Sequence, residues 1–553
     1  MTNPRFSDLR SPQWRNLLCV MPLLFLLPAG LSAQFNHQDS LRGSITPERA
    51  WWDLTYYHLD IAVDVAEKRL AGSNTVQYRV LQPGQRMQID LQPPMALTAA
   101  VQSGDSLPFT RLGNVYYIDF PEAAAAGSLQ ELTLHYQGRP RVAIRPPWDG
   151  GLTWEKDSNG NPFVATSCQG EGASLWWPCK DHAYDEPDSM LISVRVPDSL
   201  VEVSNGRLRA LQPHEDGTHT YHWFVDNPIN NYGVNVNIGD YVHWSEVYEG
   251  ESGPLDCDYY VLRENEAKAR AQFKQVPMML EAFEHWFGPY PFYEDGFKLV
   301  EVPYLGMEHQ SSVTYGNRYR NGYLGMDLSG TGWGQKFDFI IIHESGHEWF
   351  ANNITYKDIA DMWVHEGFTA YSENLYLDYH YGKEASADYV IGTRANVLND
   401  RPVIGPYNVN QSGSSDMYYK GANLLHTIRT WLDEDERWRE ILRGLNREFY
   451  HQTVTTAQVE QYLIEQTGLP LQKAFDQYLR DTRIPILQIQ KKGRRLRYRW
   501  TETVEGFNMP VELQSEVRTV TVEPDTEWKT IRLRKGEKFE INRNYYVNLQ
   551  KIR

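Results

Sequence analysis

Between residues 51 and 240, apolar and polar side chains alternate with a period of two. The clearest runs are HLDIAVDV (58–65), NTVQYRVL (74–81), MLISVRVP (190–197) and THTYHWFV (218–225). Such alternation places every second side chain on one face of a strand, and the clusters of Gly, Pro, Asn and Asp between the runs are typical of turns. The pattern predicts an N-terminal antiparallel β domain, which we place at residues 45–245.

The hydrophobic period lengthens towards 3.6 after about residue 265, which indicates helices. EAKARAQFKQVPMMLEAFEHWFG (266–288) is rich in helix-forming residues and contains one proline that is expected to kink or split the helix. A later helix is predicted to begin at Thr455, because Gln458 three residues on completes a capping box, and to end at Gly468. These patterns predict a mainly helical domain over residues 246–482.

Alternation returns after residue 482, in ILQIQ, RRLRYRW, RTVTVE, WKTIRL and YYVNL. We therefore expect a small C-terminal β module, similar to a β-sandwich, over residues 483–553. Its basic run KKGRRLRYR (491–499) fits either a surface for a polyanion or a strand with one solvated face. The alternation of Arg495, Arg497 and Arg499 with apolar residues favours the strand.

The composition of the 553 residues excludes some classes of protein. Aromatic residues make up 13% of the chain, which does not fit a disordered protein. The formal net charge of −17 argues against a general nucleic-acid binder, which needs clustered Lys and Arg.

The one long apolar stretch lies near the N-terminus, at residues 17–33, and follows Arg5, Arg10 and Arg15. It is short for a membrane span and ends in small residues, so it predicts a signal peptide over residues 1–33; an uncleaved signal anchor is the alternative. We expect a mature protein that is exported, periplasmic or secreted, without stable membrane insertion. Removal of residues 1–33 would take Cys19 with it, and the three cysteines that remain are too few for a disulfide scaffold; Cys168 and Cys179 would either pair or remain buried free thiols.

The chemistry is indicated first by FDFIIIHESGHEWF (337–350), which contains the pattern H-E-x-x-H. His343 and His347 are four residues apart and so share one face of a helix, where they can bind one Zn²⁺. Glu344, between them in the sequence, can reach a water molecule bound to that ion. A zinc hydrolase needs a third protein ligand, and Glu366 follows His347 after 18 intervening residues on a second predicted helix. A short connection between antiparallel helices would bring Glu366 opposite the histidines.

These motifs resemble those of the aminopeptidase N family of zinc metallopeptidases, gluzincins that include the leukotriene hydrolase branch. HESGHEWFANN (343–353) and WVHEGFTAYSE (363–373) are similar to the two zinc-ligand motifs of the family. YLGMEHQ (304–310) is similar to its exopeptidase motif, MYYKGANLL (417–425) to its catalytic tyrosine segment, and SCQGEGASLWWPCKDH (167–182) to a substrate-binding stretch. The resemblance covers about residues 45–550 and implies an α+β multidomain fold with a thermolysin-like catalytic domain.

The resemblance also implies roles for individual residues. His343, His347 and Glu366 would hold one zinc ion per chain. Glu344 would be the general base, and Tyr418 would stabilise the oxyanion, with the neighbouring Tyr419 as the alternative. Glu308 would bind the α-ammonium of the substrate with help from Gln169, for which Glu171 is the alternative. Gly306 and Met307 would line the substrate backbone.

The chain departs from the family pattern at four positions, His309, Glu348, His365 and Tyr419, and shows no helical domain after residue 482. Ligands and base are retained, so we expect a zinc aminopeptidase that acts on peptides with a free N-terminus. The alternatives are an endopeptidase, an epoxide hydrolase or an inactive zinc-binding protein. A single sequence indicates neither the preferred N-terminal residue nor the oligomeric state.

Overall fold

The computed structural model describes residues 35–552, so the predicted signal peptide lies outside the described residues. Two short helices, α1 (His37–Gly43) and α2 (Pro47–Ala50), precede the first strand. No helix within the described range is long and apolar enough to cross a membrane.

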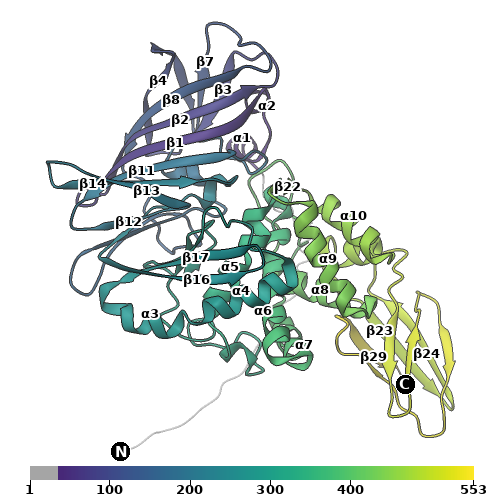
Figure 1. The fold of residues 1–553 in the computed structure, drawn as a ribbon. Helices are drawn as coiled ribbons and strands as arrows, with labels where there is room; N and C mark the ends of the chain where they lie inside the picture. Colours follow the sequence, from purple (N-terminus) through teal and green to yellow (C-terminus); the bar gives the residue numbers. More distant parts are fainter. Residues whose placement is uncertain (1–34, 553) are drawn as a thin grey trace, which may run out of the picture. The chain divides into compact units, whose positions relative to one another are not determined.

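The N-terminal part is built on a large sheet in which β1, β2, β8 and β11 lie side by side (Figure 1). The sheet has the order β13-β14-β11-β1-β2-β8-β4-β5, with β1 (Trp52–Asp64), β2 (Arg69–Val80), β4 (Ala96–Gln102), β5 (Asp105–Ser106), β8 (Leu129–Gly138), β11 (Ser189–Pro197), β13 (Arg207–Pro213) and β14 (Thr218–Val225). The expected antiparallel pairing holds for its strand pairs with one exception. β1 and β11 pair in parallel, with β11 on the edge of β1 opposite to β2.

Two smaller sheets complete this part. One has the order β12-β15-β10-β9, with β9 (Gly151–Lys156), β10 (Pro162–Ser167), β12 (Val201–Val203) and β15 (Asn237–Gly239); the other has the order β3-β7-β6, with β3 (Arg86–Asp90), β6 (Phe109–Leu112) and β7 (Val115–Asp119). The alternating runs bury one face of each strand in a shared core that includes Tyr57, Val76 and Ile192. The loop after β10 carries Gln169 and leads into the functional site.

The central part combines one sheet with most of the helices. The sheet has the order β16-β17-β18-β20-β19, with β16 (Tyr241–Gly250), β17 (Gly253–Leu262), β18 (Phe297–Glu301), β19 (Gly306–Met307) and β20 (Val313–Tyr315). The predicted boundary at residues 245 and 246 falls inside β16. β19 forms the edge of this sheet, which leaves one side of Gly306 and Met307 without a neighbouring strand.

The helices of the central part are α3 (Glu266–Gln272), α4 (Gln275–Phe287), α5 (Phe339–Gly346), α6 (Trp363–Tyr381), α7 (Lys383–Gly392), α8 (Tyr419–Leu432), α9 (Asp435–Glu448), α10 (Thr456–Thr467) and α11 (Gln472–Leu479); β21 (Ile354–Tyr356) and β22 (Gln452–Val454) form a small parallel pair. The predicted break in the first helical run is present, between α3 and α4. The capping box of Thr455 and Gln458 is also present, and Gly468 ends α10 in the left-handed conformation.

The C-terminal module consists of two sheets around one core, as predicted. The first has the order β27-β24-β23-β29, with β23 (Ile486–Lys492), β24 (Arg495–Thr501), β27 (Lys529–Arg532) and β29 (Asn548–Ile552); the second has the order β26-β25-β28, with β25 (Val511–Gln514), β26 (Thr519–Val522) and β28 (Glu540–Ile541). Leu496, Tyr498 and Trp500 of β24 point into this core, so the basic run forms a strand with one buried face, as predicted.

Candidate metal centre and active site

The helix α5 is wholly buried and carries His343, and the second predicted ligand, His347, directly follows its last residue, Gly346. Asp338 caps it, because its carboxylate accepts hydrogen bonds from the backbone of Ile340 and Ile341. Gly346 allows α6 to pass close to α5, since a β-carbon there would lie only 2.6 Å from the hydroxyl of Ser372. This close packing brings the first turn of α6, and with it Glu366, opposite the histidines.

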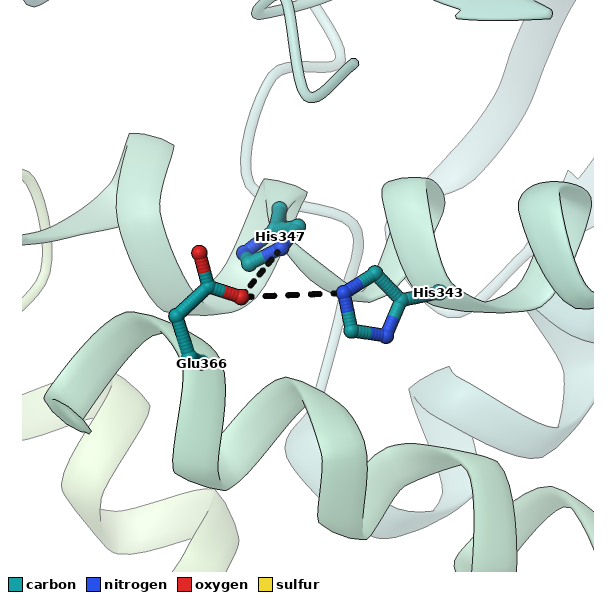
Figure 2. Close-up of side chains that lie close together, drawn as sticks. All are labelled: His343, His347 and Glu366. Carbon is teal, nitrogen blue, oxygen red and sulfur yellow. Dashed lines mark ion pairs between the residues drawn. The ribbon is translucent and has the colours of Figure 1, made fainter. Parts of the chain in front are cut away.

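His343, His347 and Glu366 converge as the sequence predicts (Figure 2). The Nε2 atoms of His343 and His347 lie 3.6 and 3.4 Å from the same Glu366 oxygen, Oε2. All three side chains are buried. Eighteen residues separate His347 from Glu366 in the sequence. The end of α5 and the first turn of α6 nevertheless supply three donor atoms to one point.

The outer nitrogen of each imidazole is held by the protein. His343 Nδ1 lies 2.7 Å from Oε1 of Glu373, and the hydroxyl of Tyr389 donates to the other oxygen of Glu373. His347 Nδ1 lies 2.9 Å from the carbonyl oxygen of Phe350. Because these acceptors require a proton on Nδ1, both Nε2 atoms present lone pairs towards Glu366.

This donor set fits a zinc ion. Glu366 Oε2 is buried and accepts no hydrogen bond in the described structure, and it faces two nitrogen lone pairs. With neutral imidazoles three acceptors meet at one point and repel one another, so the arrangement calls for a cation there, either a proton on an imidazole or a metal ion. Two imidazoles and one carboxylate leave the fourth tetrahedral position for water, as in catalytic zinc sites.

The charged side chains around the three ligands stabilise a cation between them. Burial opposes the charged form of His343, but Glu366 and Glu373 raise its pKa above the ordinary value. Burial also opposes ionisation of Glu366, but the two histidines lower its pKa. The cluster thus attracts a cation into a region that excludes water.

Glu344, Glu308 and Tyr418 surround the three ligands. One oxygen each of Glu308 and Glu344 and one nitrogen of His347 all lie within 4.8 Å of one another. Burial raises the pKa of Glu344, which makes its carboxylate a better proton acceptor. The ring of Tyr418 stacks against that of His343 with centroids 6.0 Å apart.

Tyr418 and Tyr419 lie in different surroundings. Burial and the nearby Glu366 raise the pKa of Tyr418, so its hydroxyl keeps the proton that it would donate. Tyr419 lies near Glu373 instead, on the outer side of His343. The close crossing of α6 and α8, in which a β-carbon on Gly421 would lie 2.9 Å from Gly367, places Tyr418 beside the ligands.

Gln169, rather than Glu171, reaches the site. Its side-chain amide donates to Glu308 Oε1 at 2.5 Å and to Glu366 Oε1 at 2.9 Å. Glu171 turns away and pairs with Arg141 at 3.1 Å. The amide of Gln169 therefore joins the proposed ammonium-binding residue to a predicted metal ligand.

The loop that carries Gln169 is fixed by contacts from distant segments. The carbonyl oxygen of Gly170 accepts hydrogen bonds from Arg42 at 3.0 Å and from Asn410 at 3.1 Å. Arg42 belongs to α1, and the backbone N–H of Asn410 donates to the carbonyl of Asp39 in the same helix. The helix α1 thus ties the Gln169 loop to the segment that precedes Tyr418.

Several residues of the site were not predicted from the sequence. Glu373 lies seven residues after Glu366, on the same face of α6, so the spacing could have indicated a partner for His343. Tyr232 is buried beside Glu308. Its pKa is raised mainly by burial and, in second place, by the charge of Glu308. No pattern in the sequence connects Tyr232 or Arg42 with the motifs of the central domain.

Two departures from the family pattern are buried and paired. Glu348 accepts hydrogen bonds from the hydroxyl of Tyr290 and the backbone of Ser311. His365 accepts a hydrogen bond from the backbone N–H of Tyr356 at 2.7 Å. Cys168, Cys179 and Cys257 are free thiols, all buried, so the predicted alternative of a Cys168–Cys179 disulfide is not formed.

Comparison with known families gives two matches. Residues 54–232 match the peptidase M1 N-terminal domain, and residues 271–478 match the peptidase family M1 domain. Together the two regions cover most of the chain.

Several curated proteins are similar in sequence. Tricorn protease-interacting factor F2 of Thermoplasma acidophilum is 21% identical over 63% of this chain and 44% of its own length. Human endoplasmic reticulum aminopeptidase 1 is 23% identical over 60% of this chain and 36% of its own length. Mouse aminopeptidase B is 22% identical over 75% of this chain and 66% of its own length. The chain thus spans less than half of the first two relatives.

The fold is similar to that of solved M1 zinc metallopeptidases. A mutant enzyme from Deinococcus radiodurans bound to a Tyr-Ser-Ala substrate superposes with a TM-score of 0.67 at 20% identity, covering 78% of this chain and 95% of that one. A second structure of an M1 zinc metallopeptidase from the same organism gives a TM-score of 0.65 at 21% identity, and the match covers 76% of this chain and 92% of that one. Both matched domains, the order of the motifs and the geometry of the three ligands agree, and the chain belongs to peptidase family M1.

Proposed function

We propose that this chain is a zinc-dependent aminopeptidase, which removes N-terminal residues from peptides by a metal-activated water. The observation that carries the proposal is the position of Glu308. Its buried carboxylate lies beside His347 and Glu344, and no Lys or Arg of the described residues forms an ion pair with it. A substrate ammonium is the natural partner for an anion in this position, and it would place the first peptide bond at the metal site.

Zinc at His343, His347 and Glu366 would polarise the scissile carbonyl and acidify its bound water. Glu344 would be the proton carrier, because its carboxylate would accept the proton of the attacking water and return it to the leaving amine. Its raised pKa suits both steps, because the group must take up a proton and release it again. The hydroxyl of Tyr418, which keeps its proton, donates a hydrogen bond to the oxygen on which negative charge develops.

The amine end of the substrate would be held by Glu308 and Gln169. Glu308 supplies the charge, and Gln169 fixes the carboxylate of Glu308 through its side-chain amide. The unpaired edge of β19 offers backbone groups of Gly306 and Met307 to an extended peptide, in the manner of strand addition. The substrate would then be aligned by its backbone and stopped by its own N-terminus.

An endopeptidase is the strongest alternative within the same chemistry. An internal peptide segment has no ammonium, so its binding would bury the Glu308 carboxylate without a partner, at a cost of several kcal/mol. A structural neighbour of the same family is solved with L-arginine and another with L-tryptophan, ligands that carry a free amine. These observations favour the exopeptidase. An inactive binding protein is disfavoured because the base and all three ligands are retained.

The proposal extends to the place of action. The chain is expected to be exported, because basic residues, an apolar stretch and small residues follow one another over residues 5–33. The first described helix begins at His37, just beyond the predicted cleavage site after Ala33. Mass spectrometry of the N-terminus of the protein recovered from an exporting host should find residues 1–33 removed; an intact N-terminus would contradict export by this route.

The activity itself is tested with a panel of aminoacyl fluorogenic substrates. We expect hydrolysis of several free-amine substrates, its loss on treatment with a chelator, and its return when one equivalent of zinc is added. The same panel would give the preferred N-terminal residue. Hydrolysis that persists in the chelated, metal-free protein would contradict the proposal.

A further inference from the structure

The C-terminal module differs in charge from the rest of the chain. Residues 483–553 contain sixteen Lys and Arg against nine Asp and Glu, an excess of seven positive charges. The whole chain carries −17, so the preceding 482 residues carry −24. The matched M1 regions end at residue 478, and the catalytic residues all precede this module. A function of its own therefore has to be sought on its surface.

Five of the sixteen cationic residues lie on the outward face of the sheet β27-β24-β23-β29. Leu496, Tyr498 and Trp500 point inward, so the alternate side chains of β24 and their cross-strand neighbours point outward. The cationic residues in outward positions, named here the cationic face, are Lys492, Arg495, Arg497, Arg499 and Arg532. Within the described strands of this sheet, no outward position holds Asp or Glu.

Three of these cations lie in one row across three strands. Lys492 of β23 is directly opposite Arg495 of β24, and Arg495 is directly opposite Arg532 of β27. Directly opposed side chains lie about 5 Å apart at their β-carbons, and like charges in such pairs destabilise a sheet. No Asp or Glu of the described residues forms an ion pair with any of these three cations, and two acidic residues of the module are engaged elsewhere, Asp525 with Lys529 and Glu537 with Arg518.

The other two cations are held in fixed orientations. The guanidinium groups of Arg497 and Arg499 each stack on the ring of Trp528 at 4.7 Å. Arg499 also donates to Gln488 at 2.9 Å, and Gln488 donates to Gln550 at 2.6 Å. A guanidinium group that stacks on a ring still has N–H groups with which it can bind phosphate oxygens.

We propose that the cationic face docks the enzyme on the surface of an anionic phospholipid bilayer. The five charges form a two-dimensional array on an open sheet, and five cavities in the described residues are all lined by other side chains. An array of this kind matches a plane of phosphate groups better than a small ligand that needs a pocket. Phosphate groups would also relieve the repulsion within the row of Lys492, Arg495 and Arg532.

The charge distribution also determines the orientation of the docked protein. The strongly acidic remainder of the chain is repelled by the same surface that attracts the module. The catalytic part would therefore point away from the bilayer, towards dissolved peptides. Docking of this kind does not require the peptidase activity, so the docking proposal and the proposed function are tested independently.

The test is a vesicle sedimentation assay with the full chain and two matched variants. The face variant is Lys492→Gln, Arg495→Gln, Arg532→Gln; Arg497 and Arg499 are kept because they pack on Trp528. The control variant, Arg534→Gln, Lys535→Gln, Lys538→Gln, removes the same charge from exposed positions elsewhere in the module. Vesicles contain phosphatidylcholine with or without about one third phosphatidylglycerol.

We expect the parent and the control variant to bind the anionic vesicles at low salt and to be released as salt is raised. The face variant should bind about 100-fold more weakly, since each Lys or Arg near an anionic membrane contributes about a fivefold gain in binding. Equal loss in both variants, no binding by the parent, or equal binding to neutral vesicles would each overturn the proposal. Parent protein that binds soluble heparin but not the vesicles would also overturn it, in favour of a polysaccharide.

A stability measurement gives an independent check. The substitutions in the face variant remove like charges that oppose one another, so its midpoint of urea unfolding should rise above that of the parent. Hydrolysis of a soluble aminoacyl substrate should not change. A face variant that loses vesicle binding while its midpoint falls would show that the row is structural, and would contradict the docking role.

Discussion

The side-chain amide of Gln169 lies 2.5 Å from a carboxylate oxygen of Glu308, although the two residues belong to different domains of the fold. The same amide nitrogen donates to Glu366, the third predicted metal ligand. One residue of the N-terminal β part thus connects the site for the substrate amine with the metal centre. Correct placement of the substrate depends on how firmly the Gln169 loop is held.

The first prediction concerns the metal. Purified protein should contain about one zinc ion per chain, because three donors meet at one point and leave one open position. His343→Ala should lose both the zinc and the activity, as measured by metal analysis and substrate hydrolysis. His243→Ala, at an exposed histidine paired with Asp258, serves as the control and should keep both. Zinc retained at full stoichiometry in the His343 variant would show that the metal binds elsewhere.

The second prediction concerns the base. Glu344→Gln preserves the size of the side chain but removes its capacity to accept a proton. Zinc should remain bound, while kcat should fall by at least about 100-fold. Metal analysis and single-turnover kinetics on the same preparation check both parts. Near-normal turnover with zinc bound would mean that another group activates the water.

The third prediction concerns Arg42, which positions the Gln169 loop. Arg42→Met removes a hydrogen bond to the Gly170 carbonyl, and kcat/KM for free-amine peptides should fall about 10-fold, mainly through KM. Zinc content should not change, and Arg42→Lys should restore part of the loss because Lys can still donate. The control is Arg139→Met, which removes an exposed pair with Glu67 on the surface. A fall in kcat alone would contradict a role in substrate placement.

The fourth prediction concerns Glu202, which is fully buried in β12 and far from the functional site in sequence. Burial raises its pKa well above the ordinary value of 4.5, and one of its oxygens accepts no hydrogen bond in the described structure. The folded state therefore retains a proton that the unfolded chain releases above about pH 4.5. The stability that this group contributes is complete below that pH and declines as the pH rises towards the folded pKa.

Glu202→Gln removes this titration. The variant should gain stability relative to the parent as the pH is raised from 4.5 to 8, while the hydrogen bond from Trp223 is kept. Urea unfolding of both proteins at several pH values measures the difference. A difference that does not vary with pH would show that Glu202 is ionised in the folded protein.

Local patterns were sufficient to predict much of this fold. The period-two runs, the capping box at Thr455 and the spacing from His343 to Glu366 depend on residues close in sequence, and all are found as expected. The parallel pairing of β1 with β11 was not predicted, because alternation within a strand does not specify the direction of its neighbour.

The candidate site could be predicted only as far as its motifs extend. The convergence of Glu366 on the histidines follows from two helices joined by a short connection. The contacts of Arg42 with Gly170 and of Tyr232 with Glu308 join segments more than 70 residues apart. Such contacts depend on how the domains pack, and neither residue lies in a motif.

The central claim is that Glu308 binds a free substrate amine beside a zinc centre. The most direct measurement compares kcat/KM for a free peptide and its N-acetylated form, in the parent protein and in Glu308→Ala. Acetylation of the substrate and loss of Glu308 remove opposite halves of one interaction, so each alone should lower kcat/KM by about 100-fold or more, with little further loss when they are combined. Zinc content should be equal in both proteins. Acetylated and free peptides that the parent cleaves equally fast would contradict the claim, and would identify the enzyme as an endopeptidase.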